Sequence, residues 1–184
     1  MTKEKNVQPL RTKAEIEDFR WALSKYARAR DLFLFNLGIN VGLRVSDLVP
    51  LTVQDVRGKT HLVMTEQKTK KTKRFLIPRA TREMIEDYTR DMSPSVWLFP
   101  SQKGNSHIST TQAYRVLQKA ADALGRDDIG THTMRKTFGY HHYKQNKDVA
   151  VLQQLFNHSA PSITMKYIGV TEDEVDATME DFVL

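Results

Sequence analysis

The chain of 184 residues contains no cysteine. This absence excludes a disulfide framework, a thiolate metal site and a cysteine nucleophile. No uninterrupted apolar run approaches the length of a membrane-spanning helix, so we expect no membrane partner. Residues 1–5 are polar and no apolar stretch follows them, which argues against a secretory signal. These features fit a cytoplasmic protein.

The sequence also lacks internal repeats, low-complexity tracts and any linker rich in proline, glycine and serine. With 40% hydrophobic and 27% charged residues, its composition is that of an ordinary globular protein. We therefore interpret residues 1–184 as a single domain. Residues 1–11 would be an N-terminal extension, and residues 168–184 an acidic C-terminal tail.

The net charge of +6 is unevenly distributed. Residues 57–90 contain ten Lys or Arg and four Asp or Glu, whereas the segment after Tyr167 contains six acidic residues and no basic one. The basic middle segment indicates a polyanionic partner, and the acidic tail indicates a partner that is a protein surface. The alternative is that both segments are simply solvated faces.

The pattern of apolar residues predicts a mainly helical α+β domain. Thr12 and Glu15 have the spacing of a capping box, which opens a first amphipathic helix. Two short strands are predicted at 61–65 and 74–77, joined by a basic hairpin loop at 66–73. Further helices are predicted at 32–41, 45–51, 81–91, 110–124, 132–145, 148–157 and 161–168, with an acidic helix after residue 171.

Four short segments contain the candidate catalytic residues. They are 42–48 (GLRVSDL), 68–70 (KTK), 132–135 (HTMR) and 155–159 (LFNHS), and Tyr167 follows in 165–168 (MKYI). Each residue has a plain structural alternative. Arg44 has an ion-pair partner available in Asp47, Lys68 is one of several solvated lysines, and Tyr167 suits an amphipathic core position. His132 and Arg135 would then belong to an exposed helix face.

Taken together, the order Arg44, Lys68, His132, Arg135, His158, Tyr167 resembles the tyrosine recombinases, the family of phage integrases and bacterial chromosome-dimer resolvases. The resemblance runs from about residue 12 to residue 167. It implies the catalytic-domain fold of that family, mainly helical with a small antiparallel sheet at one edge. It also implies a site-specific recombinase or integrase that cuts and rejoins DNA through a 3′-phosphotyrosyl intermediate, without ATP, metal or other cofactor.

The resemblance assigns a role to each residue of this set. Arg44 and Arg135 would clamp the scissile phosphate, because the guanidinium fork fits two phosphate oxygens. Tyr167 would be the nucleophile, and we expect the two arginines and a nearby acceptor to favour its ionised form.

The remaining catalytic roles fall to His132, His158 and a lysine. His132 would accept the tyrosine proton or serve as a further phosphate ligand, and His158 would donate to a phosphate oxygen. Lys68 would be the general acid for the departing 5′-oxygen, with Lys70 as the second choice.

Other basic and polar residues are predicted to contact double-stranded DNA. Basic side chains of the hairpin suit the phosphate backbone, and polar side chains of the 110–124 helix suit base edges. The candidates are Lys70, Lys71, Lys73, Arg74, Gln112, Arg115 and Gln118. We expect no metal site. His132, His141 and His142 share a predicted helix, but no carboxylate or cysteine completes a zinc-site spacing.

Two departures from the family pattern matter. No N-terminal core-binding domain precedes the catalytic segment, so the chain is either naturally short or a fragment. Asn157 stands where glycine is common before the motif histidine, and asparagine tolerates the same left-handed backbone.

The assembly and the activity each leave alternatives open. The resemblance implies a tetramer on DNA, with Val175, Met179 and Phe182 of the tail docking on a neighbouring protomer. The alternative is a tail that packs back in cis or frays. The alternative activities are relaxation like that of a type IB topoisomerase, and a non-cutting DNA-binding regulator. The expected setting is a bacterial or phage-encoded, nucleoid-associated protein.

Overall fold

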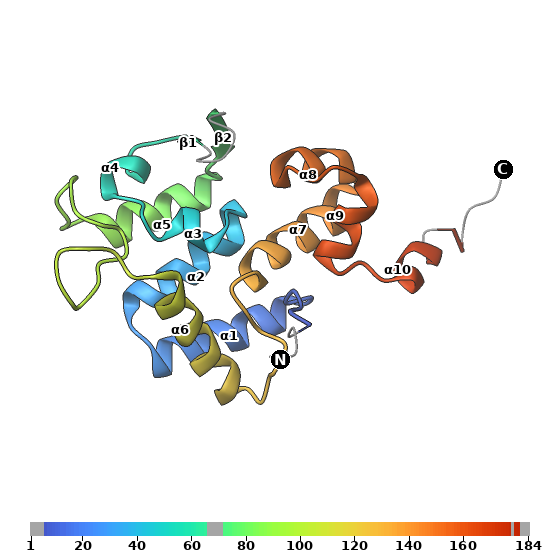
Figure 1. Cartoon of the computed structure of the whole chain (residues 1–184), viewed down its shortest axis with the longest axis horizontal. Helices are drawn as coiled ribbons and strands as arrows, with labels where there is room; N and C mark the ends of the chain where they lie inside the picture. Colours follow the sequence, from blue (N-terminus) through green and yellow to red (C-terminus); the bar gives the residue numbers. More distant parts are fainter. Residues whose placement is uncertain (1–5, 66–71, 178, 181–184) are drawn as a thin grey trace.

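A computed structural model describes residues 6–65, 72–177, 179 and 180 (Figure 1). It confirms the predicted mainly helical α+β fold with one small antiparallel sheet. The elements in order are α1 (Lys13–Tyr26), α2 (Ala29–Val41), α3 (Val45–Leu48), α4 (Val53–Val56), β1 (His61–Thr65), β2 (Thr72–Leu76), α5 (Arg79–Thr89), α6 (Thr110–Ala123), α7 (Thr133–Asn146), α8 (Val149–Phe156), α9 (Pro161–Ile168) and α10 (Glu172–Asp176).

A large hydrophobic cluster packs α1 to α6 together with the first turn of α7. The capping box predicted at Thr12 and Glu15 is present at the start of α1. In the middle of this cluster, α2 approaches α7 closely at Gly38. A Cβ atom at Gly38 would lie 2.6 Å from the Met134 sulfur, so a side chain there would push the two helices apart.

A second, smaller cluster lies under α8 and α9. Its buried members are Leu152, Phe156 and Ile168, and the rings of Phe138 and Tyr167 pack against it. Because α7 places Met134 in the large cluster and Phe138 against the small one, this helix connects the two packing units. Figure 1 shows α8, α9 and α10 gathered on one side of the molecule, with α7 leading to them.

The sheet consists of β1 and β2 in antiparallel register, with His61 opposite Leu76 and Thr65 opposite Thr72. The predicted start of the second strand at residue 74 is wrong, because Thr72 and Lys73 already pair with β1. Lys73 therefore lies on a strand, not in the hairpin loop. The four-residue helix α4 was not predicted at all. Its capping box, Thr52 with Asp55, is the sequence signal for it.

The acidic segment after Tyr167 forms α10, as predicted, and begins with a capping box at Thr171 and Glu174. Glu174 also accepts hydrogen bonds from Tyr140 and Lys144 of α7. The apolar side chains of Val175 and Met179 are 44% and 62% exposed. The described part of the tail is thus held in cis through a polar contact, while its apolar side chains stay open to solvent.

None of the helices in the described part of the chain is both long and apolar enough to cross a membrane.

Candidate active site

Arg135 is the buried centre of the site. It lies in the first turn of α7 and is 3% exposed. Its Nη1 donates to the Gly42 carbonyl at 2.8 Å and its Nη2 to the Phe156 carbonyl at 3.3 Å, while its guanidinium carbon lies 4.1 Å from the centre of the Phe156 ring. Burial and the nearby Arg44 lower the pKa of Arg135 to about 10, which leaves it charged at neutral pH. A fixed cation thus lies at the junction of α2, α7 and α8.

Tyr167 and His132 are in direct contact beside that cation. The Tyr167 hydroxyl oxygen lies 3.0 Å from Nδ1 of His132, which is the N-cap residue of α7. Burial lowers the pKa of His132, and the charges of Lys136 and Arg135 lower it further. The ring is therefore neutral at pH 7. With its proton on Nε2, it accepts a hydrogen bond from the phenol at Nδ1.

The two arginines act on Tyr167 in the expected direction, because both lower its pKa. Burial raises the pKa of Tyr167 above its ordinary value of 10, and this effect exceeds the lowering by Arg135 and Arg44. In the DNA-free protein the phenol is therefore protonated at neutral pH.

His158 follows the C-cap of α8, where Asn157 has the left-handed backbone expected of it, with φ 58°. Its Nδ1 lies 2.9 Å from the hydroxyl of Thr164, and its ring centre lies 5.1 Å from that of Tyr167. Burial lowers the pKa of His158, and so do Arg135 and Arg44. Thr164 is fully buried and was missed in the sequence, although its position three residues before Tyr167 places both on one face of α9.

Arg44 is exposed at the N-cap of α3, directly after the turn that ends α2 at Gly42. Its charge lowers the pKa values of His132, His158 and Tyr167, so it acts on the same small region as Arg135. The structure therefore brings five of the six predicted catalytic residues together. The sixth, Lys68, lies outside the described residues. Their catalytic roles remain predictions.

The predicted DNA-contact residues near the hairpin are only partly described. Lys70 and Lys71 lie outside the described residues. Lys73 is half-buried on β2. Arg74 is exposed on β2, and its Nη2 lies 3.3 Å from Nδ1 of His61.

The three candidates on α6 differ in what their side chains already contact. Gln112 accepts a hydrogen bond from the Ser109 backbone and so completes the capping box of its own helix. Gln118 donates to the Ile129 carbonyl at 2.6 Å. Arg115 is exposed. The two glutamines therefore have structural contacts that the sequence did not reveal, and contact with bases remains a prediction for all three.

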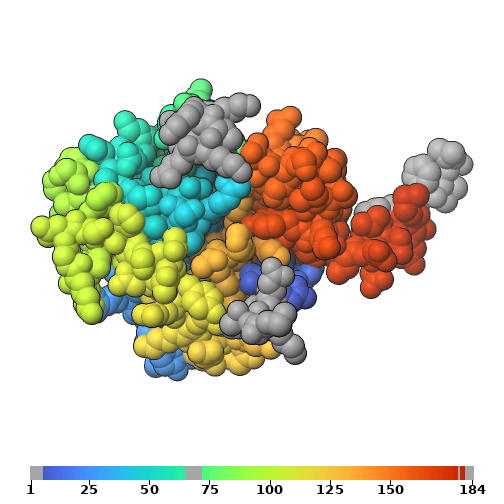
Figure 2. Space-filling model, in the orientation of Figure 1, coloured from blue at the N-terminus to red at the C-terminus, as the bar shows by residue number. Residues whose placement is uncertain are grey.

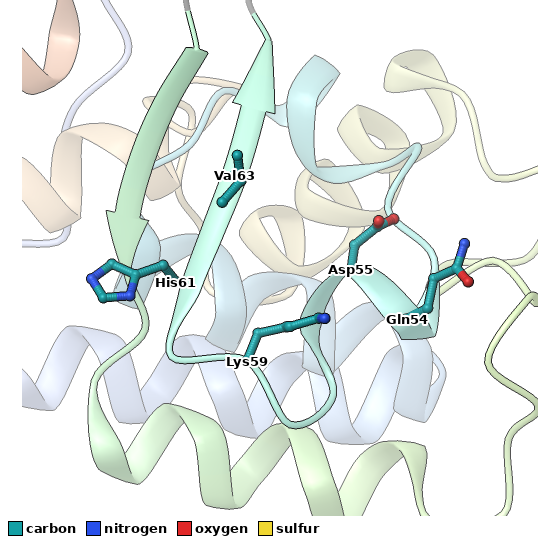
Figure 3. Close-up of a pocket in the computed structure, with 5 residues that line it drawn as sticks. All are labelled: Gln54, Asp55, Lys59, His61 and Val63. Carbon is teal, nitrogen blue, oxygen red and sulfur yellow. The ribbon is translucent and has the colours of Figure 1, made fainter.

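A separate pocket of about 420 Å³ lies against the outer face of the sheet (Figure 3). Gln54 and Asp55 of α4 line it together with Lys59, and β1 contributes His61 and Val63. The five clustered residues described above do not line this pocket. Within the part of the chain that the structure describes, no group of three or more His, Asp or Glu side chains is placed to hold a metal ion.

Comparison with known proteins gives consistent matches. The sequence model of the family described as "Phage integrase family" matches residues 9–174. The "Probable integrase/recombinase YoeC" of Bacillus subtilis (strain 168) is 49% identical over 177 residues, which is 96% of this chain and 97% of that protein. "Tyrosine recombinase XerC" of Thermodesulfovibrio yellowstonii is 29% identical over 79% of this chain and 52% of that protein. The chain spans about half the length of several other curated relatives that it matches.

Solved structures share the fold. The crystal structure of XerA recombinase has a TM-score of 0.73 at 17% identity and covers 97% of this chain and 64% of that chain. XerH site-specific recombinase bound to a palindromic difH substrate also has a TM-score of 0.73 at 17% identity. That match covers 92% of this chain and 51% of that chain.

Proposed function

The chain belongs to the phage integrase family and is related to the tyrosine recombinases, and on this premise we propose that it is a site-specific recombinase acting on double-stranded DNA. Tyr167 is the nucleophile. The observation that carries the proposal is the contact of 3.0 Å between the Tyr167 hydroxyl and Nδ1 of His132, beside two arginines. A protonated phenol with a neutral acceptor and flanking cations is equipped for attack on a phosphodiester.

In the proposed cleavage step, Arg44 and Arg135 bind the non-bridging oxygens of the scissile phosphate. The Tyr167 oxygen attacks phosphorus while its proton passes to Nδ1 of His132. The new bond is a 3′-phosphotyrosyl ester, and the bond to the 5′-oxygen breaks. Lys68 supplies the proton that this oxygen takes up. The ester retains the energy of the broken bond, so attack by another 5′-hydroxyl reverses the step without ATP.

His158 completes the charge stabilisation. When the Thr164 hydroxyl donates to Nδ1 of His158, the proton of the neutral ring lies on Nε2 and is available to a phosphate oxygen. The transition state then meets donors from Arg44, Arg135 and His158, of which Arg135 is held by two backbone carbonyls and His158 by the Thr164 hydroxyl. Preorganised donors of this kind stabilise developing negative charge because they need no rearrangement during the reaction.

DNA binding and assembly follow from the same proposal. Lys70, Lys71, Lys73 and Arg74 would contact the phosphate backbone, and Gln112, Arg115 and Gln118 the bases. The exposed Val175 and Met179 support docking of the tail on a second protomer in a tetramer, whereas the cis contacts of Glu174 oppose it. The residues 1–184 would act as a single catalytic domain on DNA in a bacterial nucleoid.

The proposal is tested by covalent trapping. Nicked suicide duplexes from the DNA flanking the gene are incubated with the protein in EDTA and analysed on a denaturing gel. We expect an adduct that survives SDS and is lost in Tyr167→Phe, which retains the ring but not the hydroxyl. DNA binding without any adduct would contradict the proposal and favour a non-cutting regulator.

A second measurement separates recombination from relaxation like that of a type IB topoisomerase. Light scattering gives the mass of the complex on duplexes that carry the cleaved site. A recombinase brings two sites together with four protomers. A mass that corresponds to one protomer on DNA would contradict recombination and favour relaxation.

A further inference from the structure

Residues 7–11, called the N-terminal strap below, are packed across α7. Leu10 is fully buried, its backbone N–H donates to the Thr137 hydroxyl at 2.9 Å, and its carbonyl accepts from Nε2 of His141 at 2.9 Å. Figure 2 shows the blue N-terminal residues lying between the orange of α7 and the red of the C-terminal helices. The strap therefore has a fixed position on the helix that supplies His132 and Arg135.

The strap reaches the end of the nucleophile helix through Arg11. Its Nη2 donates to the Gly169 carbonyl at 2.6 Å. Gly169 is the C-cap of α9, with φ 78°, and lies two residues after Tyr167. A Cβ atom at Gly169 would lie 3.2 Å both from Arg11 Nη2 and from Pro9 Cδ, which shows how closely the strap approaches this turn. A cation at a helix C-terminus also interacts favourably with the helix dipole.

A second link reaches the tyrosine ring itself. The carbonyl of Val7 accepts a hydrogen bond of 2.6 Å from Nζ of Lys136. The same ammonium lies 5.4 Å from the centre of the Tyr167 ring, within the range of a cation–π contact. The two ends of the strap thus constrain both the ring of Tyr167 and the turn that follows it.

Arg11 also contacts the tail. Its Nη1 lies 3.4 Å from the Glu174 carboxylate, and its guanidinium lies 5.0 Å from the centre of the Tyr140 ring. Glu174 accepts a hydrogen bond of 2.5 Å from the Tyr140 hydroxyl. Two effects of Arg11 are therefore possible, one on α9 through Gly169 and one on α10 through Glu174. Substitution of Glu174 separates them, since it leaves the Gly169 contact in place.

We propose that Arg11 is a positioning residue for cleavage, which fixes the C-terminal turn of α9 and so keeps the Tyr167 hydroxyl at its place beside His132 and the phosphate. The inference rests on the proposed role of Tyr167 as nucleophile. Arg11 touches neither of the reacting groups. Its effect is on geometry, and a displacement of about 1 Å in a reacting group costs roughly 100-fold in rate.

The test is the rate of adduct formation in a single turnover, with protein in excess over the suicide duplex. In Arg11→Gln we expect a rate roughly 10- to 100-fold below wild type, with DNA affinity changed less than about threefold. Arg11→Lys should recover part of the rate, because its ammonium still donates to the Gly169 carbonyl. Equal rates in Arg11→Gln and wild type, under conditions where wild type forms adduct, would overturn the proposal.

Two control variants make the result specific. Arg30 also donates to a backbone carbonyl, that of Pro100 at 2.6 Å, and pairs with a carboxylate, that of Asp31 at 2.6 Å. Arg30→Gln removes comparable contacts that involve neither the strap nor α9 and α10, so its rate should stay within about threefold of wild type. Glu174→Gln should also keep the rate. If Glu174→Gln is as slow as Arg11→Gln, the effect acts through α10 and the proposal is wrong.

Hydrogen exchange without DNA gives a readout that does not depend on cleavage. Backbone amides of residues 161–170 should exchange faster in Arg11→Gln than in wild type, while those of α6 keep their protection and show that the fold is intact. Unchanged exchange across 161–170 would contradict the positioning role. A wild-type protein that forms no adduct would instead contradict the proposed function, so the two failures are distinguishable.

Discussion

Replacing Arg135 by lysine tests whether one guanidinium connects the two packing units. The side chain is buried and bonded to two carbonyls, one at the end of α2 and one at the end of α8. A single ammonium nitrogen cannot reproduce the planar fork that spans Gly42 and Phe156. The variant therefore loses one charged hydrogen bond, worth about 1.5–3 kcal/mol, and the stack on Phe156, worth about 0.5–2 kcal/mol.

We expect Arg135→Lys to lower the free energy of unfolding by about 2–4 kcal/mol, which for a chain of this size corresponds to a Tm lower by roughly 5–15 °C. Urea unfolding followed by circular dichroism measures the change. Arg115→Lys, at an exposed position on α6, is the matched control and should change stability by less than about 0.5 kcal/mol. A similarly small change in Arg135→Lys would refute the idea that this residue holds α2 and α8 together.

Three further predictions concern the site and its DNA. Burial and neighbouring cations, Arg44 among them, lower the pKa of His132, so below pH 6.5 the folded protein binds fewer protons than the unfolded chain and stability falls as the pH falls. In Arg44→Gln an NMR titration should show the pKa of His132 rising, and an unchanged value would contradict the electrostatic argument. Thr164→Val removes the hydroxyl from Nδ1 of His158 and should cost about 1 kcal/mol in urea unfolding and slow adduct formation; wild-type values for both would show that this bond does not orient the ring. If about six phosphates are contacted, the logarithm of the DNA association constant should fall with the logarithm of salt concentration at a slope near −5, and Arg74→Gln should reduce that slope by about 1. An association constant that does not change with salt concentration would contradict binding to the phosphate backbone of DNA.

Helix positions could be predicted from the sequence because apolar spacing and caps are local. The 161–168 helix has the predicted bounds, with Pro161 at its first turn and a left-handed glycine after it. The short helix α4 was missed because four residues carry too little periodicity. The start of β2 was misplaced because Thr72 and Lys73 are polar, and their strand conformation comes from pairing with β1.

The site, like the fold, could be predicted from the sequence only in part. The ordered set of Arg, Lys, His and Tyr residues predicted the chemistry, and the fold places five of the six together. The sequence could not show that burial outweighs the arginines at Tyr167, because burial depends on the packing of α9 against α7 and α8. Nor could it show that the Gln118 amide is committed to the Ile129 carbonyl, since that partner belongs to a loop that folds back on α6.

The small cluster beneath α8 and α9 has a consequence for the proposed cleavage step. Its buried apolar members are Leu152, Phe156 and Ile168, far fewer than those of the main core. Regions with few buried contacts open at lower free energy than the rest of a protein. Tyr167 packs on this small unit, whereas Arg44 and the first turn of α7 belong with the larger one. For the nucleophile proposed above, we therefore expect local opening of this small unit to separate Tyr167 from His132 and Arg135 at a lower free energy than global unfolding, so that the proposed cleavage step would require the small unit to be ordered.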